Sequence, residues 1–322
     1  MKGENPLVNV IIGTCNRAEI MPRAVNSVLK QSYKEVEVIL VDDASIDNTP
    51  DVVSSFTDKR VRYIRHDKNK KIAAVSNTGF KHSNGELIAL LGDDDEWIDK
   101  DKLRKQISIY KEKKDSNIGI VCTWWQHIDN GVVLTKHTPV APPNWVERIL
   151  ISNSIICGST PLIPRHVLES VGGFDEKMKR GVDSDLFRRI IIKGYDVVII
   201  PEIMVNVYTD SPNRITPVNT FEENVKCLKS VQYVLEKFSN TFDKYPRAKA
   251  ARYYQMARYA YSAYVLSKDS YYFRESESYL KEGLKNKIAM KPAILAMAIH
   301  FPGFKSYYRK KLEYNFVTSA ED

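Results

Sequence analysis

Four short apolar runs alternate with helical stretches over the first 91 residues, and this alternation limits the fold more than any other feature. The pattern predicts strands at residues 8–12, 36–41, 61–65 and 87–91, separated by helices at residues 19–31, 49–56 and 72–82. Strands and helices that alternate at this length indicate βαβ units and hence a mostly parallel sheet. We therefore predict an α/β fold in which helices flank that sheet.

Polar residues follow three of these strands at the points where the strands end. In open sheets of this kind, ligands bind in the crevice beyond the carboxyl ends of the strands. We therefore expect three polar clusters, distant in the sequence, to converge on one edge of the sheet. The candidate ligand-binding residues in these clusters are Thr14, Asn16, Arg17, Asp42, Asp43, Asp93, Asp94 and Asp95.

Four consecutive acids, at residues 93–96, directly follow the apolar run at residues 87–91. Crowded like charges repel one another, so the run is either a solvated acidic turn or a site where a cation offsets the repulsion. Hard divalent cations such as Mg²⁺ and Mn²⁺ bind carboxylate and phosphate oxygens. The sequence has neither of the Gly-rich phosphate-binding patterns, G-x-G-x-x-G or G-x-x-x-x-G-K-[ST], so a bound diphosphate requires a metal to neutralise it.

The composition is that of a soluble globular protein, with 43% hydrophobic and 27% charged residues in a chain of 322. Its four cysteines are scattered without a C-x-x-C pair, which argues for a reducing compartment and against a zinc site. No signal-peptide pattern begins the chain, and no stretch approaches the ~20 apolar residues of a spanning helix. We expect a cytoplasmic protein, with the inner face of the cell membrane as the alternative location.

Five motifs, in order, resemble those of the family 2 glycosyltransferases. They are I-I-G-T-C-N-R at residues 11–17, S-V-L-K-Q-S-Y at 27–33, V-D-D-A-S-I-D-N-T at 41–49, L-G-D-D-D-E-W at 91–97 and V-G-G-F-D-E at 171–176. The resemblance extends over residues 6–209. It implies a GT-A fold and an inverting transfer of a sugar from a nucleoside diphosphate sugar, with a UDP-sugar as the expected donor.

The resemblance also implies roles for the residues of the first two clusters. Thr14, Asn16 and Arg17 would lie beside the donor, and Asp43 or its neighbour Asp42 would hydrogen-bond the base. A carboxylate accepts hydrogen bonds only, which suits the N–H group of a base.

In the third cluster, the resemblance assigns Asp93 to the ribose and Asp94 to the metal, Mn²⁺ or Mg²⁺. Asp95 would assist as a second metal ligand, acting through water. Where the family often has its first Asp, this chain has Gly92, so Asp93 and Asp95 are the alternative metal-binding pair.

Residues 69–77, N-K-K-I-A-A-V-S-N, resemble the family pattern N-x-G-x-a-a-a-R-N. Lys71 stands where the family has Gly, and Ser76 stands where it has Arg. We expect Lys71 and Asn77 to contact the donor, with Lys70 as the alternative phosphate contact. A solvated pair of lysines is the competing interpretation.

Inverting transfer needs one general base to take the proton of the acceptor hydroxyl. The stretch V-D-S-D-L at residues 182–186 resembles the family's E-D-x-D-L, in which the first Asp is that base. Asp183 is therefore the predicted catalytic residue, although Val182 replaces the usual Glu. The alternative role for Asp183 is that of a helix N-terminal acid, worth ~0.3–1 kcal/mol through the helix dipole.

The last third of the chain differs in composition from the rest. We expect a GT-A domain at residues 1–215 and a basic, Tyr-rich helical region at residues 216–322, with helices at 248–267 and 271–285. This region holds +7 of the net charge of +8. Its basic, aromatic residues at 252–261 and 294–311 suit either a peripheral contact with an anionic membrane or helices packed in a homo-oligomer. No nucleic-acid-binding module accompanies them.

The sequence thus predicts a metal-dependent, inverting glycosyltransferase, of the hexosyl- or N-acetylhexosaminyl-transferase class. The expected acceptor is a hydroxyl group of a glycan, a lipid-linked glycan or another glycoconjugate, in the synthesis of a bacterial cell-surface polysaccharide. The alternative is a catalytically inactive GT-A domain that binds sugar nucleotides or glycans.

Overall fold

The computed structural model describes residues 5–113, 116–152, 155–210 and 220–285. The chain divides into two compact units, Met1–Pro217 and Val218–Asp322.

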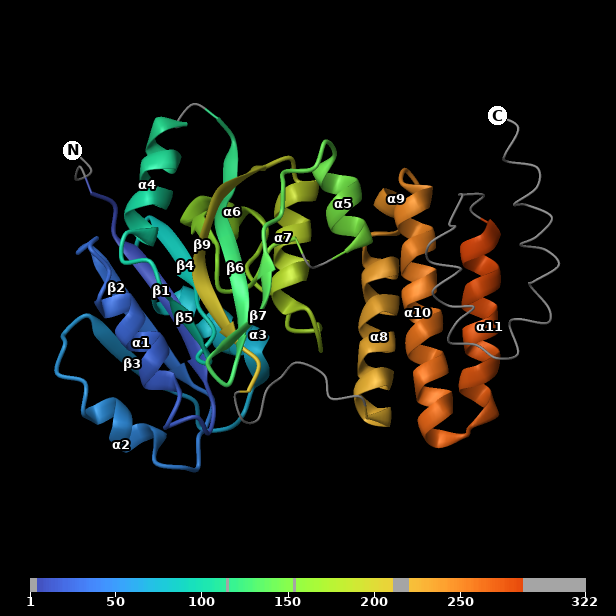
Figure 1. The fold of residues 1–322 in the computed structure, drawn as a ribbon, viewed down its shortest axis with the longest axis horizontal. Coiled ribbons are helices and arrows are strands. Elements are labelled where there is room, and N and C mark those ends of the chain that lie inside the picture. The colour runs from blue at the N-terminus through green and yellow to red at the C-terminus, as the bar shows by residue number, and fades with distance from the viewer. Residues whose placement is uncertain (1–4, 114–115, 153–154, 211–219, 286–322) are drawn as a thin grey trace. The chain divides into compact units, whose positions relative to one another are not determined.

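Within its described residues, the first unit contains one nine-stranded sheet (Figure 1). The strands follow the order β3-β2-β1-β4-β8-β6-β9-β5, and β7 pairs with β6 beside this path. Their bounds are β1 Val8–Thr14, β2 Val36–Asp42, β3 Val61–Arg65, β4 Leu87–Leu90, β5 Asp95–Trp97, β6 Ile118–Asp129, β7 Val132–His137, β8 Leu162–Pro164 and β9 Asp196–Tyr208.

One half of this sheet is parallel and the other half is mixed. Strands β3, β2, β1 and β4 pair in parallel, which confirms the βαβ units expected from the sequence. Beyond β4, strand β8 runs antiparallel to both β4 and β6, whereas β6 and β9 are parallel. The expectation of an α/β fold with helices flanking the sheet is confirmed.

Helices cover both faces of the parallel half. The helices described in the first unit are α1 Met21–Leu29, α2 Thr49–Ser54, α3 Lys71–His82, α4 Lys102–Glu112, α5 Trp145–Ile151, α6 Arg165–Ser170 and α7 Val182–Ile192. Val10 and Ile12 of β1 share a core with α1, and Ile11 between them faces α3, because successive strand side chains point to opposite faces. A Cβ atom at Gly79 of α3 would lie 2.5 Å from Ile11 Cγ2, so glycine permits this close approach.

Three elements depart from the sequence-based expectation. Helix α4 was not predicted, because Lys102 and Gln106 lie on its buried face and interrupt the apolar periodicity. Strand β5 lies within the acidic run, and β9 continues to Tyr208 rather than ending at residue 200. The mixed half of the sheet therefore brings β5 and the end of β9 together.

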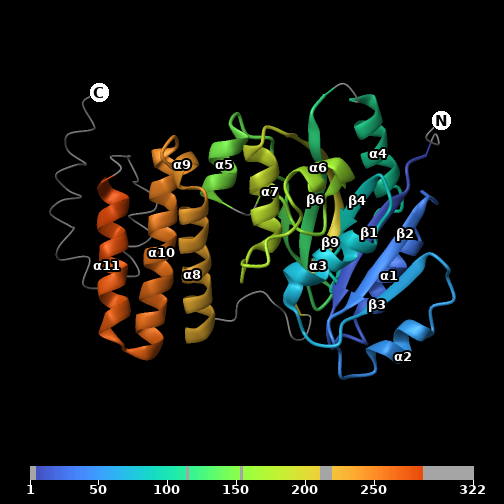
Figure 2. The ribbon, with the colours of Figure 1, turned by 180° about the vertical axis from the view of Figure 1, so that it is seen from behind.

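The second unit is a helical bundle. Its described helices are α8 Phe221–Lys237, α9 Ser239–Phe242, α10 Pro246–Ser267 and α11 Ser270–Lys285, with α10 between α8 and α11 (Figure 2). Leu228, Val231, Met256 and Ala260 form a shared core.

The basic, aromatic surface expected on α10 is only partly present. Arg252 and Tyr254 are buried inside the bundle, whereas Arg258 is exposed. The expected membrane or oligomer contact at residues 294–311 lies outside the described residues. Among the described helices, none is both long and apolar enough to cross a membrane.

Candidate functional site

The polar turns that follow β1, β2 and β4 meet at one edge of the sheet. Thr14 pairs with Asp42 at the ends of β1 and β2, and Ile11 pairs with Leu90 of β4. The backbone N–H of Asn16 donates to Ser45 Oγ at 2.9 Å, which joins the first turn to the second. The expected convergence of these clusters is confirmed.

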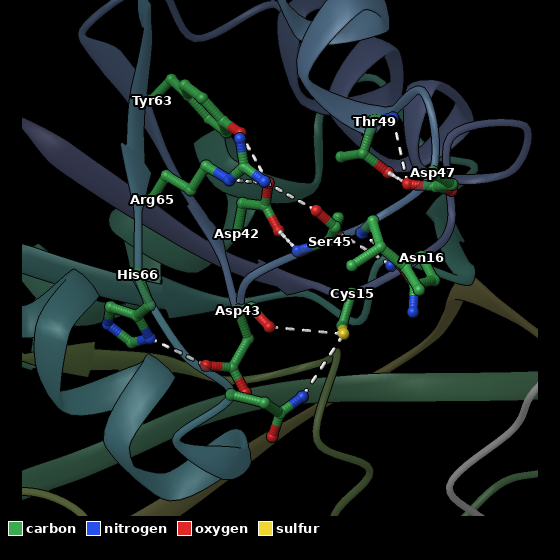
Figure 3. A network of polar contacts seen from close by, with 12 residues as sticks. Cys15, Asn16, Asp42, Asp43, Ser45, Asp47, Thr49, Tyr63, Arg65 and His66 are labelled. Atoms are coloured by element: carbon green, nitrogen blue, oxygen red, sulfur yellow. Dashed lines mark hydrogen bonds and ion pairs between the residues drawn. The ribbon is translucent and has the colours of Figure 1, made fainter.

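Asp42 is fully buried and builds the second turn (Figure 3). Its Oδ1 accepts the N–H of Ser45 at 2.8 Å, and its Oδ2 accepts the Tyr63 hydroxyl at 2.6 Å. Arg65 Nε lies 3.6 Å from the same oxygen. Burial and the bond to Asp42 raise the pKa of the Tyr63 hydroxyl, which keeps Tyr63 a donor. These internal partners leave Asp42 poorly placed to contact a ligand.

Asp43 is the better placed of the two candidate base-binding carboxylates. Its Oδ1 accepts the N–H of Lys70 at 2.7 Å and lies 2.8 Å from His66 Nδ1, while Oδ2 accepts the N–H of Lys71 at 2.8 Å. A carboxylate has about four acceptor positions, so Oδ2 retains room for one further donor. Figure 3 shows Asp43 between His66 and the first turn.

Lys71 has an unusual backbone conformation at the start of α3. Its φ is +72°, in the left-handed region that glycine tolerates best. This backbone conformation explains why the family pattern has Gly at this position. Lys71 adopts the same conformation although it carries a Cβ atom. The side chain of Lys71 is exposed.

Asn16 also has a positive φ, of 54°, and its side-chain oxygen accepts the N–H of Ile46 at 2.8 Å. Asn tolerates this region better than most residues because its side chain bonds locally. Thr14, at the end of β1, is buried. Both residues therefore lie at the edge of the sheet where β1 ends.

Arg17 supplies a positive charge to the acidic run. Its Nη1 lies 2.7 Å from Asp93 Oδ1 and 2.9 Å from Asp94 Oδ2, and the guanidinium is buried. Burial raises the pKa of Asp93 to about 6, against the opposing effect of Arg17. Arg23 adds a bond of 2.7 Å from Nη2 to the carbonyl of Asp94 and stacks over the ring of Tyr208.

Asp95 is held from another direction. The hydroxyl of Ser159 donates to Asp95 Oδ2 and accepts the N–H of Gly92 at 2.9 Å. A Cβ atom at Gly92 would lie 3.0 Å from Asp95 Oδ2 and 3.1 Å from Asp94 Oδ1, so these two oxygens flank the same point.

A divalent cation fits this pair by its donor chemistry, because Mg²⁺ and Mn²⁺ prefer carboxylate oxygens. Within the ranges that the structure describes, no group of three His, Cys, Asp or Glu residues converges on a common metal position. Solvent or phosphate oxygens would have to complete the coordination, as is usual for Mg²⁺.

Asn77 has a different environment from the other candidates. Its Nδ2 donates to the carbonyl of Phe174 at 2.9 Å and to Glu176 Oε1 at 2.8 Å, and its Oδ1 accepts the N–H of Phe174 at 2.8 Å. These contacts fasten α3 to the G-G-F-D-E loop. They do not connect Asn77 with the acids, so its contact with the donor stays a prediction.

Asp183 lies in the first turn of α7 and is partly exposed. Its Oδ1 accepts the N–H of Ser184 at 2.8 Å. Desolvation raises the pKa of Asp183, against hydrogen bonds from Ser184 and the charge of Arg188. A carboxylate with a raised pKa is a better proton acceptor than an ordinary one, which suits a general base.

Cys157 links Asp183 with the acidic run. Burial raises the pKa of its thiol well above the usual value, and the negative charges of Asp95, Asp183 and Asp94 add to the effect. The next two residues lie beside two of these carboxylates: a Cβ atom at Gly158 would lie 2.9 Å from Asp183 Oδ2, and the hydroxyl of Ser159 donates to Asp95 Oδ2. Sequence reasoning did not find this stretch, because its contacts join residues that are far apart in the chain.

The fold and the polar edge define an α/β enzyme of the GT-A type. The family model described as glycosyl transferase family 2 matches residues 9–169 of this chain. An uncharacterized glycosyltransferase of Rickettsia typhi is 30% identical over 227 residues, which cover 68% of this chain and 69% of the relative. The chain belongs to glycosyl transferase family 2 and is a glycosyltransferase.

Other relatives match a smaller part of their length. The Escherichia coli protein named UDP-Glc:alpha-D-GlcNAc-diphosphoundecaprenol beta-1,3-glucosyltransferase WfgD is 33% identical over 162 residues, half of this chain and 62% of that protein.

Solved structures share the fold at lower identity. TarS 1-349 of Staphylococcus aureus in complex with UDP-GlcNAc has a TM-score of 0.56 and 17% identity, covering 86% of this chain and 79% of TarS. The mannosyltransferase PcManGT of Pyrobaculum calidifontis in complex with GDP-Man and Mn²⁺ has a TM-score of 0.54 and 19% identity, covering 88% of each chain.

Proposed function

We propose that this protein transfers a sugar from a nucleoside diphosphate sugar to a hydroxyl group of a glycan or lipid-linked glycan, with inversion at the anomeric carbon. The observation that carries the proposal is the environment of Asp183. This partly exposed carboxylate lies beside the segment that also holds the acidic run: a Cβ atom at Gly158 would lie 2.9 Å from Asp183 Oδ2, and the hydroxyl of the next residue, Ser159, donates to Asp95. One proton acceptor near a separate acidic cluster is what a single displacement requires.

In the proposed reaction, Asp183 takes the proton of the acceptor hydroxyl as its oxygen attacks the anomeric carbon. A new C–O bond forms there, and the bond to the diphosphate oxygen breaks on the opposite side. The nucleoside diphosphate leaves with the electron pair of that bond.

Asp94 and Asp95 would hold a divalent cation, Mn²⁺ or Mg²⁺, which when bound neutralises the charge of the leaving diphosphate. Asp43 would accept a hydrogen bond from the base, and Asp93 would accept one from the ribose. Thr14, Asn16 and Arg17 would line the donor site. Lys71, exposed at the start of α3, would contact the diphosphate.

The names of related proteins support a role in the synthesis of surface glycans. WfgD of E. coli is named for a UDP-Glc donor and a diphosphoundecaprenol-linked acceptor. WcaA of E. coli K12 and TuaG of Bacillus subtilis are named as putative enzymes of colanic acid and teichuronic acid biosynthesis. We propose a UDP-sugar donor and a polysaccharide or glycolipid product on this basis.

Turnover of a donor panel tests the proposal. Purified protein is incubated with Mn²⁺ and a set of UDP- and GDP-sugars, and release of the nucleotide is measured, because slow hydrolysis reports the donor without its acceptor. We expect release from one donor that depends on the metal and is abolished in Asp183→Asn. Asp51→Asn is the matched control, because Asp51 is an exposed acid in the first turn of α2.

Two results would contradict the proposal. Release that persists in Asp183→Asn would exclude Asp183 as the base. Metal-dependent binding of a sugar nucleotide without turnover, even with undecaprenyl diphosphate glycans as acceptors, would indicate the alternative of a binding module.

A further inference from the structure

The segment at residues 157–160, between α5 and β8, contacts both parts of the proposed site. Ser159 is buried and holds the acidic run at three points. Its hydroxyl donates to Asp95 and accepts the N–H of Gly92 at 2.9 Å, and its carbonyl accepts the indole N–H of Trp97 at 2.9 Å. One residue therefore fixes the beginning, middle and end of this turn.

The preceding residue lies against the proposed base. A Cβ atom at Gly158 would lie 2.9 Å from Asp183 Oδ2 and 3.6 Å from its Cγ. The other oxygen, Oδ1, is bonded to the N–H of Ser184 at 2.8 Å. The short side chain of Asp183 is thus confined between the Gly158 backbone and the first turn of α7.

The segment itself is firmly anchored. The N–H of Thr160 donates to the carbonyl of Cys157 at 3.1 Å, and the hydroxyl of Thr160 donates to the same oxygen at 2.8 Å. Gln106 of α4 donates to the carbonyl of Thr160 at 2.9 Å. Thr160 and Gln106 are both fully buried, so this bonding is shielded from water.

We infer that Gly158 and Ser159 are positioning residues that fix the proposed base, Asp183, at a set distance from the acidic run that holds the donor. The inference rests on the proposed function. Adjacent Cα atoms are 3.8 Å apart and the peptide unit between them is planar, so the two contacts are joined by a nearly inextensible link. In-line displacement depends on such alignment, and a misplacement of about 1 Å costs roughly 100-fold in rate.

Two neighbouring substitutions should affect different quantities, kcat in one variant and UDP affinity in the other. Gly158→Ala would push Asp183 aside and lower kcat by roughly 10- to 100-fold, with the Kd for UDP and Mn²⁺ unchanged. Ser159→Ala would release Asp95 and raise the Kd for UDP in the presence of Mn²⁺, by about tenfold if one charge-assisted hydrogen bond is lost. Ser159→Thr keeps the hydroxyl and should bind UDP with the affinity of the wild type.

The experiment measures nucleotide release from UDP-glucose and UDP-N-acetylglucosamine, together with UDP binding by calorimetry. Ser108→Ala is the matched control, because Ser108 is an exposed serine on α4 outside the site. Thermal unfolding of each variant verifies its fold, and the UDP titration of Ser159→Ala tests the inference even if Gly158→Ala does not fold.

Two outcomes would overturn the inference. Unchanged kcat in Gly158→Ala would show that this contact does not position Asp183, and equal losses of kcat and UDP affinity in both variants would indicate general loosening of the fold. Asp183→Asn separates this failure from failure of the proposed function. If Asp183→Asn abolishes release while Gly158→Ala retains it, only the present inference fails.

Discussion

The guanidinium of Arg17 lies 2.7 Å from the carboxylate of Asp93, and this pair joins residues 76 positions apart in the chain. The same Nη1 atom lies 2.9 Å from Asp94. A single arginine from the turn after β1 therefore offsets the repulsion among the acids that follow β4. A metal that binds Asp94 must approach this positive charge, so Arg17 opposes metal binding until an anion such as a diphosphate is present.

Replacing Arg17 tests this opposition. Arg17→Gln should tighten Mn²⁺ binding in the absence of nucleotide by about tenfold, equivalent to ~1.4 kcal/mol, because the acids lose their counter-charge. Addition of UDP should then strengthen Mn²⁺ binding less than it does in the wild type. Electron paramagnetic resonance of free Mn²⁺ measures the Kd for Mn²⁺ with and without UDP.

Arg17→Lys retains the charge and should keep nearly wild-type Mn²⁺ affinity. Arg62→Gln removes the same charge from β3, where Arg62 pairs with Glu37, and should have no effect. Weaker Mn²⁺ binding in Arg17→Gln would contradict the expectation and show that Arg17 holds the carboxylates in place for the metal.

Lys71→Gly should raise the free energy of unfolding by about 1 kcal/mol. The left-handed backbone conformation costs a residue with a Cβ atom roughly 1–2 kcal/mol, and glycine avoids this cost at the expense of some chain entropy. The same variant should bind UDP more weakly, because it removes the proposed diphosphate contact. Urea unfolding and calorimetry measure the two effects.

Lys70→Gly is the matched control for Lys71→Gly. Lys70 has a φ of −103°, so glycine relieves no strain there and should lower stability slightly. Unchanged UDP affinity in Lys71→Gly would identify Lys71 as an ordinary solvated lysine.

The raised pKa of Asp183 predicts a pH dependence for both activity and stability. The base must be ionised, so kcat should fall with decreasing pH at a higher pH than the ordinary Asp value of about 3.9. Between that value and the raised pKa, the folded state binds more protons than the unfolded state, and stability falls as pH rises. Asp183→Asn should therefore be more stable than the wild type at neutral pH and inactive.

Thermal unfolding at pH 4 to 8, in parallel with a pH profile of nucleotide release, measures these effects. The stability difference between the wild type and Asp183→Asn should shrink toward the acidic end. A difference that does not vary with pH would show that the charge of Asp183 is not destabilising.

Lys102 should make stability rise with pH above neutrality. It is fully buried beside Trp97 and Gln106, and desolvation lowers its pKa to about 7. Between pH 7 and the unfolded value of about 10.4, only the unfolded state binds the proton. The wild type should therefore gain about 1.4 kcal/mol per pH unit relative to Lys102→Met in this range.

Urea unfolding from pH 6 to 9.5 measures the slope. Lys105→Met is the control on the same helix: its ion pairs with Asp99 and Glu202 raise the pKa of Lys105, so both states stay protonated over this range. Parallel pH profiles for the wild type and Lys102→Met would show that Lys102 remains charged when buried.

Much of the parallel half of the fold was predictable from local pattern. Strand β3 has the predicted bounds, and β1, β2 and α3 differ from their predicted bounds by a few residues. Helix α4 was not predicted because two polar residues occupy its buried face: Lys102 donates to Gln106, and Gln106 donates to carbonyls of β6 and of the segment before β8. Strand β5 was not predicted because it has only three residues, and two of them, Asp95 and Glu96, are acidic.

The sequence by itself determined the βαβ alternation, the acidic run at the end of β4 and the need for a positive charge beside it. These features depend on residues that are close together in the chain. The periodicity of apolar residues and the repulsion of adjacent like charges do not depend on the tertiary structure. Only the tertiary structure decided that Arg17 provides that charge, that Ser159 holds Asp95 and that Gly158 lies against Asp183. Those contacts join residues brought together by the order of strands in the sheet, which no local pattern encodes.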